Sequence, residues 1–290
     1  MKIRNILNKF KLYFYYLTFE RFPNLFRPST IPFVSGDTFR NFANHIFDES
    51  ITFDPRRVKQ NDIVFLSGNL VDLYFNYFHP KINSKYILIT HNSNRSIGKK
   101  DIQKADKNIL HWFACNLEIN QSKKISIIPK GLENLRRLKY GKKTWFKDNK
   151  NPKTETILFY NFDKEYLNKS TDFLNLCKNL EHKIFKEPKD YFNNLKKAKF
   201  FILPDKKELD QYRIWEGIIV NSFPIMVKSS FSNNLKNIGV PGIYLNNFQE
   251  ILNFNEDELN KIYENELMKN YTDITKFKYW KKIIESYKVI

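Results

Sequence analysis

The chain has few of the residues that build several common functional sites. It has eight glycines in 290 residues, and none of them forms a Gly-x-Gly-x-x-Gly or a Gly-Lys-Ser/Thr motif. The sequence therefore does not predict a dinucleotide site or a phosphate-binding P-loop. The five histidines form no pair at metal-ligand spacing, and no Asp-x-Asp sequence occurs. We therefore expect no bound metal.

Cysteine is also scarce. The two cysteines, Cys115 and Cys177, each lie within an apolar stretch, where buried, reduced thiols are expected. This state fits a reducing compartment, so we expect a cytoplasmic protein. Residues 1–30 are basic and aromatic, but their apolar run is too short to cross a bilayer. No small-residue cleavage site follows, so no signal peptide is expected. This segment either lies on an anionic membrane surface or packs as a helix on the protein body.

Positive charge is abundant. Lys and Arg number 49 against 31 Asp and Glu, which gives a formal net charge of +18. Such a surface attracts nucleic acid, anionic lipid or phosphorylated substrates. No zinc-finger spacing, RNA-binding aromatic motif or helix-turn-helix is found, so specific nucleic-acid binding is not predicted. A basic, non-catalytic protein that binds an anionic membrane or nucleic acid remains the alternative to an enzyme.

The hydrophobic pattern predicts an α/β fold. Short apolar runs alternate with helical patterns from residue 31 onward, which is typical of parallel sheets covered on both faces. The expected strands of the first half are Asp62–Leu66, Tyr86–Thr90, Leu110–Cys115 and Ile125–Pro129. The expected helices between them are Phe39–Phe47, Leu70–Phe78 and Lys100–Asp106.

The pattern restarts after a charged stretch at Tyr140–Thr154, which we interpret as a linker between two lobes. The later strands are expected at Thr156–Phe162, Ile184–Phe185, Phe200–Leu203, Phe223–Val227 and Gly242–Leu245. The later helices are expected at Asn168–Asn179, Lys189–Lys197, Phe248–Leu252, Glu256–Lys269 and Ile274–Lys288. We therefore expect an N-terminal lobe at residues 1–145 and a C-terminal lobe at 146–270.

The stretch from Phe200 to Lys228 carries the clearest functional signal. Asp210 is a plausible N-cap for a helix that ends near Asn221. Arg213 falls in the first turn of that helix, where the helix dipole disfavours a cation. It shares a face with Glu216, three residues later. An arginine beside a helix N-terminus suits a phosphate, and the carboxylate can accept hydrogen bonds from sugar hydroxyls. An ordinary salt-bridged helix face is the alternative.

Four groups of residues resemble the exostosin-like glycosyltransferase family, in matching order along roughly residues 31 to 228. They are Asp210-x-x-Arg213-x-Trp215-Glu216 followed by Pro224-Ile225, Ser35-Gly36-Asp37-Thr38-Phe39-Arg40, Thr90-His91-Asn92-Ser93, and Gly131-Leu132-Glu133-Asn134. The chain departs from the family pattern at Tyr212, Asn221 and Asn94. The resemblance implies a GT-B fold of two Rossmann-like lobes, in which the last helix, within 271–290, crosses back to join the N-terminal lobe. It also implies transfer from a nucleotide-sugar donor to a glycan or lipid-linked acceptor, with the nucleotide sugar as co-substrate and no further cofactor.

The resemblance and the ends of the expected strands together suggest a site between the lobes, because ligands of open α/β sheets bind beyond the strands' carboxyl ends. Arg213 would hold the donor's diphosphate, with Lys228 as a helper. The other expected donor-binding residues are Glu216, Asp210 and Asn161. Asp37 and His91 are the candidate catalytic bases. Each also has a structural interpretation, Asp37 as an Asx turn or helix cap and His91 as a buried structural histidine. Thr90, Asn92 and Glu133 are expected to face the acceptor or the other lobe.

Overall fold

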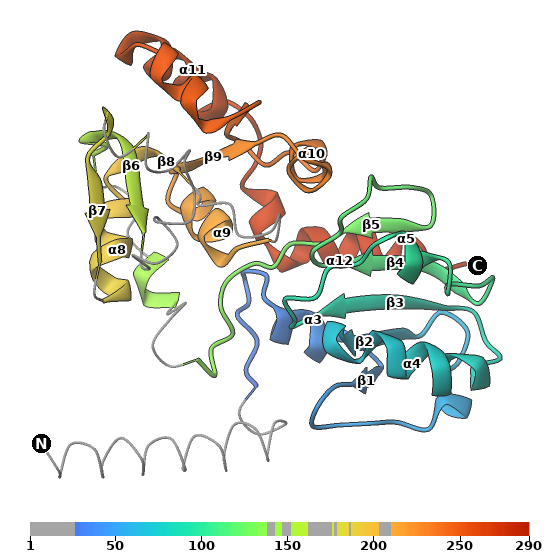
Figure 1. Cartoon of the computed structure of the whole chain (residues 1–290). Coiled ribbons are helices and arrows are strands. Elements are labelled where there is room, and N and C mark those ends of the chain that lie inside the picture. Colours follow the sequence, from blue (N-terminus) through green and yellow to red (C-terminus); the bar gives the residue numbers. More distant parts are fainter. Residues whose placement is uncertain are drawn as a thin grey trace, which may run out of the picture.

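Two parallel β-sheets form the framework of the protein (Figure 1). The computed structural model describes residues 27–137, 143–146, 152–161, 176, 179–185, 187–202 and 210–289. The first sheet has five strands in the order β1-β2-β3-β4-β5, and the second has five in the order β10-β9-β8-β6-β7. All pairings between these strands are parallel. The mixed α/β class expected from the sequence is confirmed.

The first sheet is buried on both faces. Its strands are β1 (His45–Phe47), β2 (Ile63–Ser67), β3 (Tyr86–His91), β4 (Ile109–Ala114) and β5 (Ile125–Ile127). Side chains alternate along a strand, so Val64 and Leu66 pack with Tyr74 of α4 (Val71–Tyr77), in a different cluster from their neighbour Phe65. Phe65 packs in the cluster of Phe39, which belongs to α3 (Gly36–Phe42).

The second sheet has the same construction. Its strands are β6 (Glu155–Asn161), β7 (His182–Ile184), β8 (Ala198–Ile202), β9 (Phe223–Val227) and β10 (Ile243–Leu245). Its helices are α8 (Pro188–Leu195), α9 (Tyr212–Ile219), α10 (Ser230–Asn237) and α11 (Glu256–Leu267). Gly217 of α9 faces Phe201 of β8 so closely that a Cβ there would lie 2.4 Å from the ring. On α11, Tyr263 packs 5.8 Å from Phe200 and 5.4 Å from Phe223 between ring centroids.

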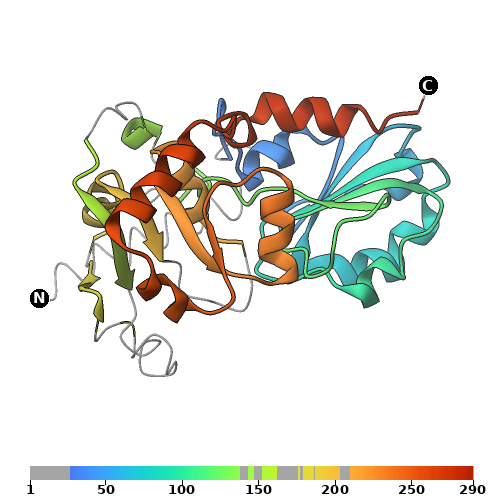
Figure 2. The same ribbon diagram turned by 90° about the horizontal axis from the view of Figure 1, so that it is seen from above.

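The last helix, α12 (Phe277–Glu285), returns to the first sheet. Trp280 and Ile284 are buried in the same cluster as Phe65. Figure 2 shows α12, in red, on one side of the first sheet and α4, in cyan to teal, on the other. Beyond α12, the backbone of Val289 exchanges two hydrogen bonds with the side chain of Asn61. Both ends of the described chain are thus tied to the N-terminal lobe.

The two lobes share apolar and polar contacts. One continuous apolar cluster includes Leu66 and Trp112 of the first sheet and Phe200 and Phe223 of the second. On α10, the Asn234 amide donates to the backbone oxygens of Leu117 and Ile119, both on the connection between β4 and β5. The short helix α5 (Lys99–Ile102) lies on the N-terminal lobe. In the described part of the chain, no helix combines the length and apolar character needed to cross a membrane.

Several expected boundaries were wrong. Phe39–Phe47 was predicted as a helix, but the helix runs from Gly36 to Phe42. It starts earlier because the Ser35 side chain accepts a hydrogen bond from the Thr38 backbone amide, and it ends where Ala43 takes an extended conformation. Residues 45–47 then form β1, whose parallel pairing with β2 the helical pattern did not reveal. The helix α10 was not predicted, although Ser229 forms a capping box with Ser232 at its start.

Other differences concern the ends of helices. The helix expected at Lys100–Asp106 ends at Ile102. The last helix begins at Phe277 rather than Ile274. Asp210 is not the N-cap of α9, because Gln211 takes that position. The helix expected at Asn168–Asn179 falls largely outside the described residues, as does most of the linker at Tyr140–Thr154.

Candidate functional site

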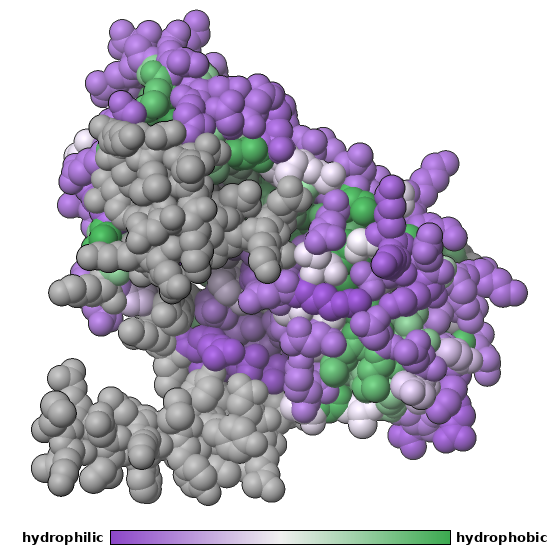
Figure 3. All heavy atoms as spheres, viewed as in Figure 1, coloured by the Kyte–Doolittle hydropathy of each residue, from purple (hydrophilic) through white to green (hydrophobic). Residues whose placement is uncertain are grey.

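A polar pocket of about 440 Å³ lies between the lobes, at the carboxyl ends of the first sheet's strands. Asn69 contributes from beyond β2, Asn92 from beyond β3, and residues 130–137 from beyond β5. The second lobe contributes Tyr212, the first residue of α9. In Figure 3 the surface is hollowed between the lobes, and the described residues visible there are hydrophilic. This is the position where open α/β sheets bind ligands.

The segment after β5 enters the pocket through a close backbone crossing. Gly131 has φ 69°, and a Cβ at this residue would lie 2.2 Å from the backbone oxygen of Val34. Only glycine fits both the left-handed conformation and this approach. The amide of Leu132 donates to the same Val34 oxygen at 2.9 Å. The crossing fixes Lys130 and Glu133 on either side of it.

A second close approach brings Asp37 and Asn92 together. The side-chain amide of Asn92 donates to the Asp37 carboxylate at 3.1 Å, and the side-chain amide of Asn134 donates to the side-chain oxygen of Asn92 at 3.0 Å. Asn134 in turn accepts from the Asp37 backbone at 2.7 Å. A Cβ at Gly36 would lie 1.7 Å from the Asn92 side-chain oxygen. The Ser35-Gly36-Asp37 turn therefore depends on glycine.

Asp37 is fully buried and sits between two arginines. Its carboxylate oxygens lie 3.6 Å from Arg27 and 3.6 Å from Arg136. Burial raises the pKa of Asp37, while the two guanidinium groups and Asn92 act to lower it. The side chain is 0% exposed, so it does not meet a ligand in the pocket directly. Its contacts orient Asn92 and Arg136, both of which line the pocket.

His91 is committed to the backbone through both ring nitrogens. Nδ1 accepts from the backbone amide of Asn92 at 2.7 Å, and Nε2 lies 3.0 Å from the Pro129 carbonyl oxygen. This arrangement requires a neutral ring with its proton on Nε2. Burial lowers the pKa of His91 to about 4. His91 therefore has no free nitrogen with which to accept a proton from a substrate, and it supports the structural interpretation.

Glu133, by contrast, lines the pocket and belongs to a cluster of acids from both lobes. The Tyr212 hydroxyl interacts with the Glu133 carboxylate across the lobe boundary. Burial raises the pKa of Glu133. Burial also raises the pKa of Glu216 to about 7, with the charge of Glu133 adding to the effect and that of Arg213 opposing it. Carboxyl groups with pKa values near neutrality can accept and return protons.

Arg213 sits on α9 next to this cluster. Its guanidinium carbon lies 5.7 Å from the centre of the Tyr191 ring on α8. Its charge acts on Glu216, one turn further along α9. Tyr212, and not Arg213, provides the α9 contribution to the pocket lining. Arg213 is thus adjacent in sequence to a residue that lines the pocket, and both its charge and that of Glu133 act on Glu216.

Asp210 joins the lobes through contacts to the protein itself. Its carboxylate accepts from the Lys130 amide at 2.6 Å and from the indole of Trp215 at 2.8 Å. Its backbone nitrogen donates to Asn116 at 3.0 Å, and its carbonyl accepts from the Lys130 ammonium at 3.1 Å. Burial raises the pKa of Asp210 to about 6. The residue holds α9 against the segment after β5, so it positions the pocket.

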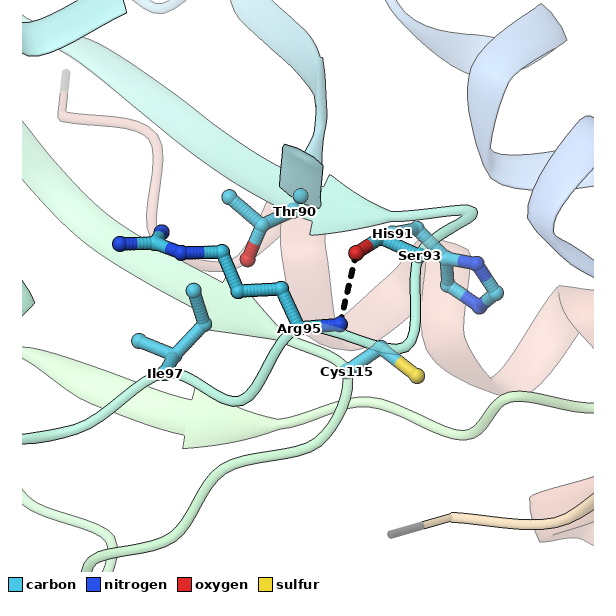
Figure 4. Close-up of a pocket in the computed structure, with 7 residues that line it drawn as sticks. Thr90, His91, Ser93, Arg95, Ile97 and Cys115 are labelled. Atoms are coloured by element: carbon cyan, nitrogen blue, oxygen red, sulfur yellow. Dashed lines mark hydrogen bonds between the residues drawn. The ribbon is translucent and has the colours of Figure 1, made fainter. Parts of the chain in front are cut away.

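Thr90 and Lys228 are not among the residues that line the pocket. Thr90 is buried, and its hydroxyl accepts from the Trp112 indole at 2.9 Å. It borders the small space shown in Figure 4, which has no room for a water molecule. Lys228 is exposed and donates to Asn246 at 3.0 Å. Asn161 ends β6, and its side chain lies outside what the structure describes.

Three cations in the pocket were not among the predicted residues. Lys130, Arg136 and Arg137 all come from the segment after β5. A weak signal was present in the sequence, since basic residues flank the Gly131-Leu132-Glu133-Asn134 motif on both sides. In a chain of this net charge, single basic residues carry little information. These three residues become part of the site because the fold directs this segment into the pocket.

No protein-family model matches the sequence, and no curated protein matches it. The function is therefore inferred from the pocket geometry and from the motifs described above.

Proposed function

We propose that this protein is a glycosyltransferase that moves a sugar from a nucleotide-sugar donor to a glycan or lipid-linked acceptor. The observation that carries the proposal is the pocket between two parallel α/β lobes, with cations and a raised-pKa carboxyl group on its wall. The motifs that resemble exostosin-like enzymes meet around this pocket. Asn92 and Glu133 line it, the side chain of Asn92 donates to Asp37, and the charge of Glu133 acts on Glu216.

The proposed reaction is a displacement at the anomeric carbon of the donor sugar. The acceptor hydroxyl oxygen forms a bond to that carbon, and the bond between the carbon and the phosphate oxygen breaks. The nucleoside diphosphate leaves with the bonding electron pair. The hydroxyl proton goes to Glu133, because its carboxylate faces the pocket, unlike the buried Asp37 and the fully hydrogen-bonded His91. Glu133 therefore replaces both as the proposed base.

The donor is assigned to the C-terminal lobe, at the start of α9. Arg213 would stabilise the leaving diphosphate. Glu216 would accept hydrogen bonds from hydroxyls of the donor, with its protonation adjusted by Glu133. Tyr212 would help to fix Glu133 in position through the interaction of its hydroxyl with the Glu133 carboxylate.

The experiment is a transfer and donor-hydrolysis assay with purified protein and a panel of nucleotide sugars. Wild-type protein is expected to hydrolyse or transfer from one donor, and EDTA is expected to leave the rate unchanged. Arg213→Gln is expected to lower the rate by about 10-fold to 100-fold, because a hydrogen bond to a charged group is worth about 1.5–3 kcal/mol. Lys189→Gln, an exposed cation on α8, is the matched control. Full activity of Arg213→Gln would contradict the assignment of the donor site.

A further inference from the structure

Asn134 belongs to a closed ring of hydrogen bonds beside Glu133. Its side-chain oxygen accepts from the Asp37 backbone amide at 2.7 Å, and its side-chain amide donates to the side-chain oxygen of Asn92 at 3.0 Å. Asn92 closes the ring by donating to the Asp37 carboxylate at 3.1 Å. Asn134 is 4% exposed, so water does not readily replace a partner that is removed from the ring.

Asp37 decides the direction of this ring. An ionised carboxylate can only accept hydrogen bonds, and a backbone N–H can only donate. Asn92 must therefore turn its NH₂ group toward the Asp37 carboxylate and its oxygen toward Asn134. Asn134 must then turn its NH₂ group toward Asn92 and its oxygen toward the Asp37 amide. A flip of either asparagine would place donor against donor and acceptor against acceptor, so each side chain has a single orientation.

Backbone contacts hold the same two segments in place. The backbone amide of Asn92 donates to Nδ1 of His91 at 2.7 Å, which fixes the chain where it leaves β3. In the segment after β5, the Leu132 amide donates to the Val34 oxygen at 2.9 Å. The Asn134 side chain is thus clamped between segments that are themselves anchored.

The ring reaches Glu133 through the backbone of Asn134. The Asn134 N–H donates to Oε1 of the Glu133 carboxylate at 3.0 Å. Burial raises the pKa of Glu133, and this hydrogen bond opposes the rise because it favours the ionised form. The N–H direction follows from the peptide plane between the two residues, which the clamped Asn134 side chain restrains.

The other groups that act on Glu133 lie outside the ring. Lys130 and Arg137 are cations of the same segment, and the Tyr212 hydroxyl comes from α9; all three act to lower the pKa of Glu133. Glu216, also on α9, is the acid whose charge is coupled to that of Glu133. Removal of the Asn134 side chain therefore changes one influence on Glu133 and leaves these four groups present.

We infer that Asn134 is a positioning residue for Glu133. The ring with Asp37 and Asn92 holds the Asn134 backbone so that its N–H meets the carboxylate that receives the acceptor's hydroxyl proton. The inference rests on the proposed function for the role of Glu133 as the base. It also gives Asp37 and His91, the bases suggested by the sequence, a supporting part in orienting Glu133.

The test follows the titration of Glu133 by NMR, in protein labelled with ¹³C at the glutamate side-chain carboxyl group. The Glu133 signal is the one that disappears in Glu133→Gln. Asn134→Ala removes the clamp, so the Glu133 signal is expected to titrate at a higher pH than in the wild type. Asn108→Ala is the control, because it removes a side-chain hydrogen bond to the Ile82 carbonyl at the amino end of β4, away from the pocket. It is expected to leave the titration of Glu133 unchanged.

Asn92→Gly provides a second variant in case Asn134→Ala does not fold. Asn92 has φ 56°, a conformation that glycine adopts readily, and the change removes the link that Asn92 makes between Asn134 and Asp37. The Glu133 titration is again expected to move to higher pH. In the double variant the shift is expected to be no larger than in Asn134→Ala alone, because both substitutions break the same ring.

Turnover of a nucleotide sugar gives a second readout. At neutral pH, Asn134→Ala is expected to lower kcat about tenfold and to leave KM for the donor unchanged, because the base acts in the transition state and does not bind the donor. The acid limb of the pH–rate profile is expected to move to higher pH together with the NMR titration. A purely structural loss would lower the amount of active protein without moving that limb.

Titration of Glu133 at the wild-type pH in both Asn134→Ala and Asn92→Gly would overturn the inference and leave the proposed function standing. A shift in these variants, without turnover of any nucleotide sugar by the wild type, would support the positioning of Glu133 by Asn134 and contradict the proposed function instead.

Discussion

The buried carboxyl group of Glu216 makes a quantitative prediction for the pH dependence of stability. Burial raises its pKa to about 7, against 4.5 for an ordinary glutamate. Because the folded pKa is the higher one, the contribution of Glu216 to stability is fully present below pH 4.5 and is lost as the pH rises through 7. The difference between about 7 and 4.5 corresponds to about 3 kcal/mol at about 1.4 kcal/mol for each factor of ten. Glu216→Gln cannot ionise, so it escapes this loss.

The assay is urea unfolding of wild-type and Glu216→Gln protein at pH 5 and pH 8. Between these two values the variant is expected to gain about 2–3 kcal/mol relative to wild type. The comparison cancels the titration of the other groups. Glu264→Gln, an exposed glutamate of α11, is the control and is expected to follow the wild type at both values. Parallel behaviour of Glu216→Gln and wild type would refute the electrostatic reasoning for the acid cluster.

The remaining predictions concern the packing around the site. Gly36→Ala places a Cβ 1.7 Å from the Asn92 oxygen, so urea unfolding is expected to show a loss of about 1–3 kcal/mol. Gly98→Ala, whose Cβ would meet nothing closer than 3.3 Å, should cost less than about 1 kcal/mol; equal costs would contradict the steric account. Lys153 donates to the carbonyls of Lys196 and Val220, at the ends of α8 and α9. Thermal melting should show Lys153→Met to be less stable by about 1–3 kcal/mol, while Lys189→Met should melt as the wild type does.

Much of the fold could be predicted because it depends on local patterns. The run Phe223–Val227 is apolar at every position and forms β9 with the predicted bounds. Parallel strands buried on both faces produce such runs directly. The strand β1 was missed because its three residues, His45–Phe47, continue the helical pattern before them. Its identity as a strand comes from pairing with β2, which no local window contains.

The site was predictable in position and less so in the role of each residue. Asp37, Asn92 and Glu133 follow from motifs near the carboxyl ends of strands, and the fold brings them together. The role of Asp210 depends on Lys130, which is 80 residues away. The two ring contacts of His91 are with the backbone and leave no sequence signal. The residue types suggest the chemistry of the site. The hydrogen-bond partners that engage each side chain are decided by tertiary contacts.

The most direct test of the proposed function is calorimetric titration of the protein with UDP-, GDP-, dTDP- and CMP-sugars. If the protein is a glycosyltransferase, at least one of these donors binds saturably, and the affinity for that donor falls about tenfold or more in Arg213→Gln. Lys189→Gln is expected to bind the same donor as the wild type does. Failure of the folded wild-type protein to bind any nucleotide sugar would contradict the central claim.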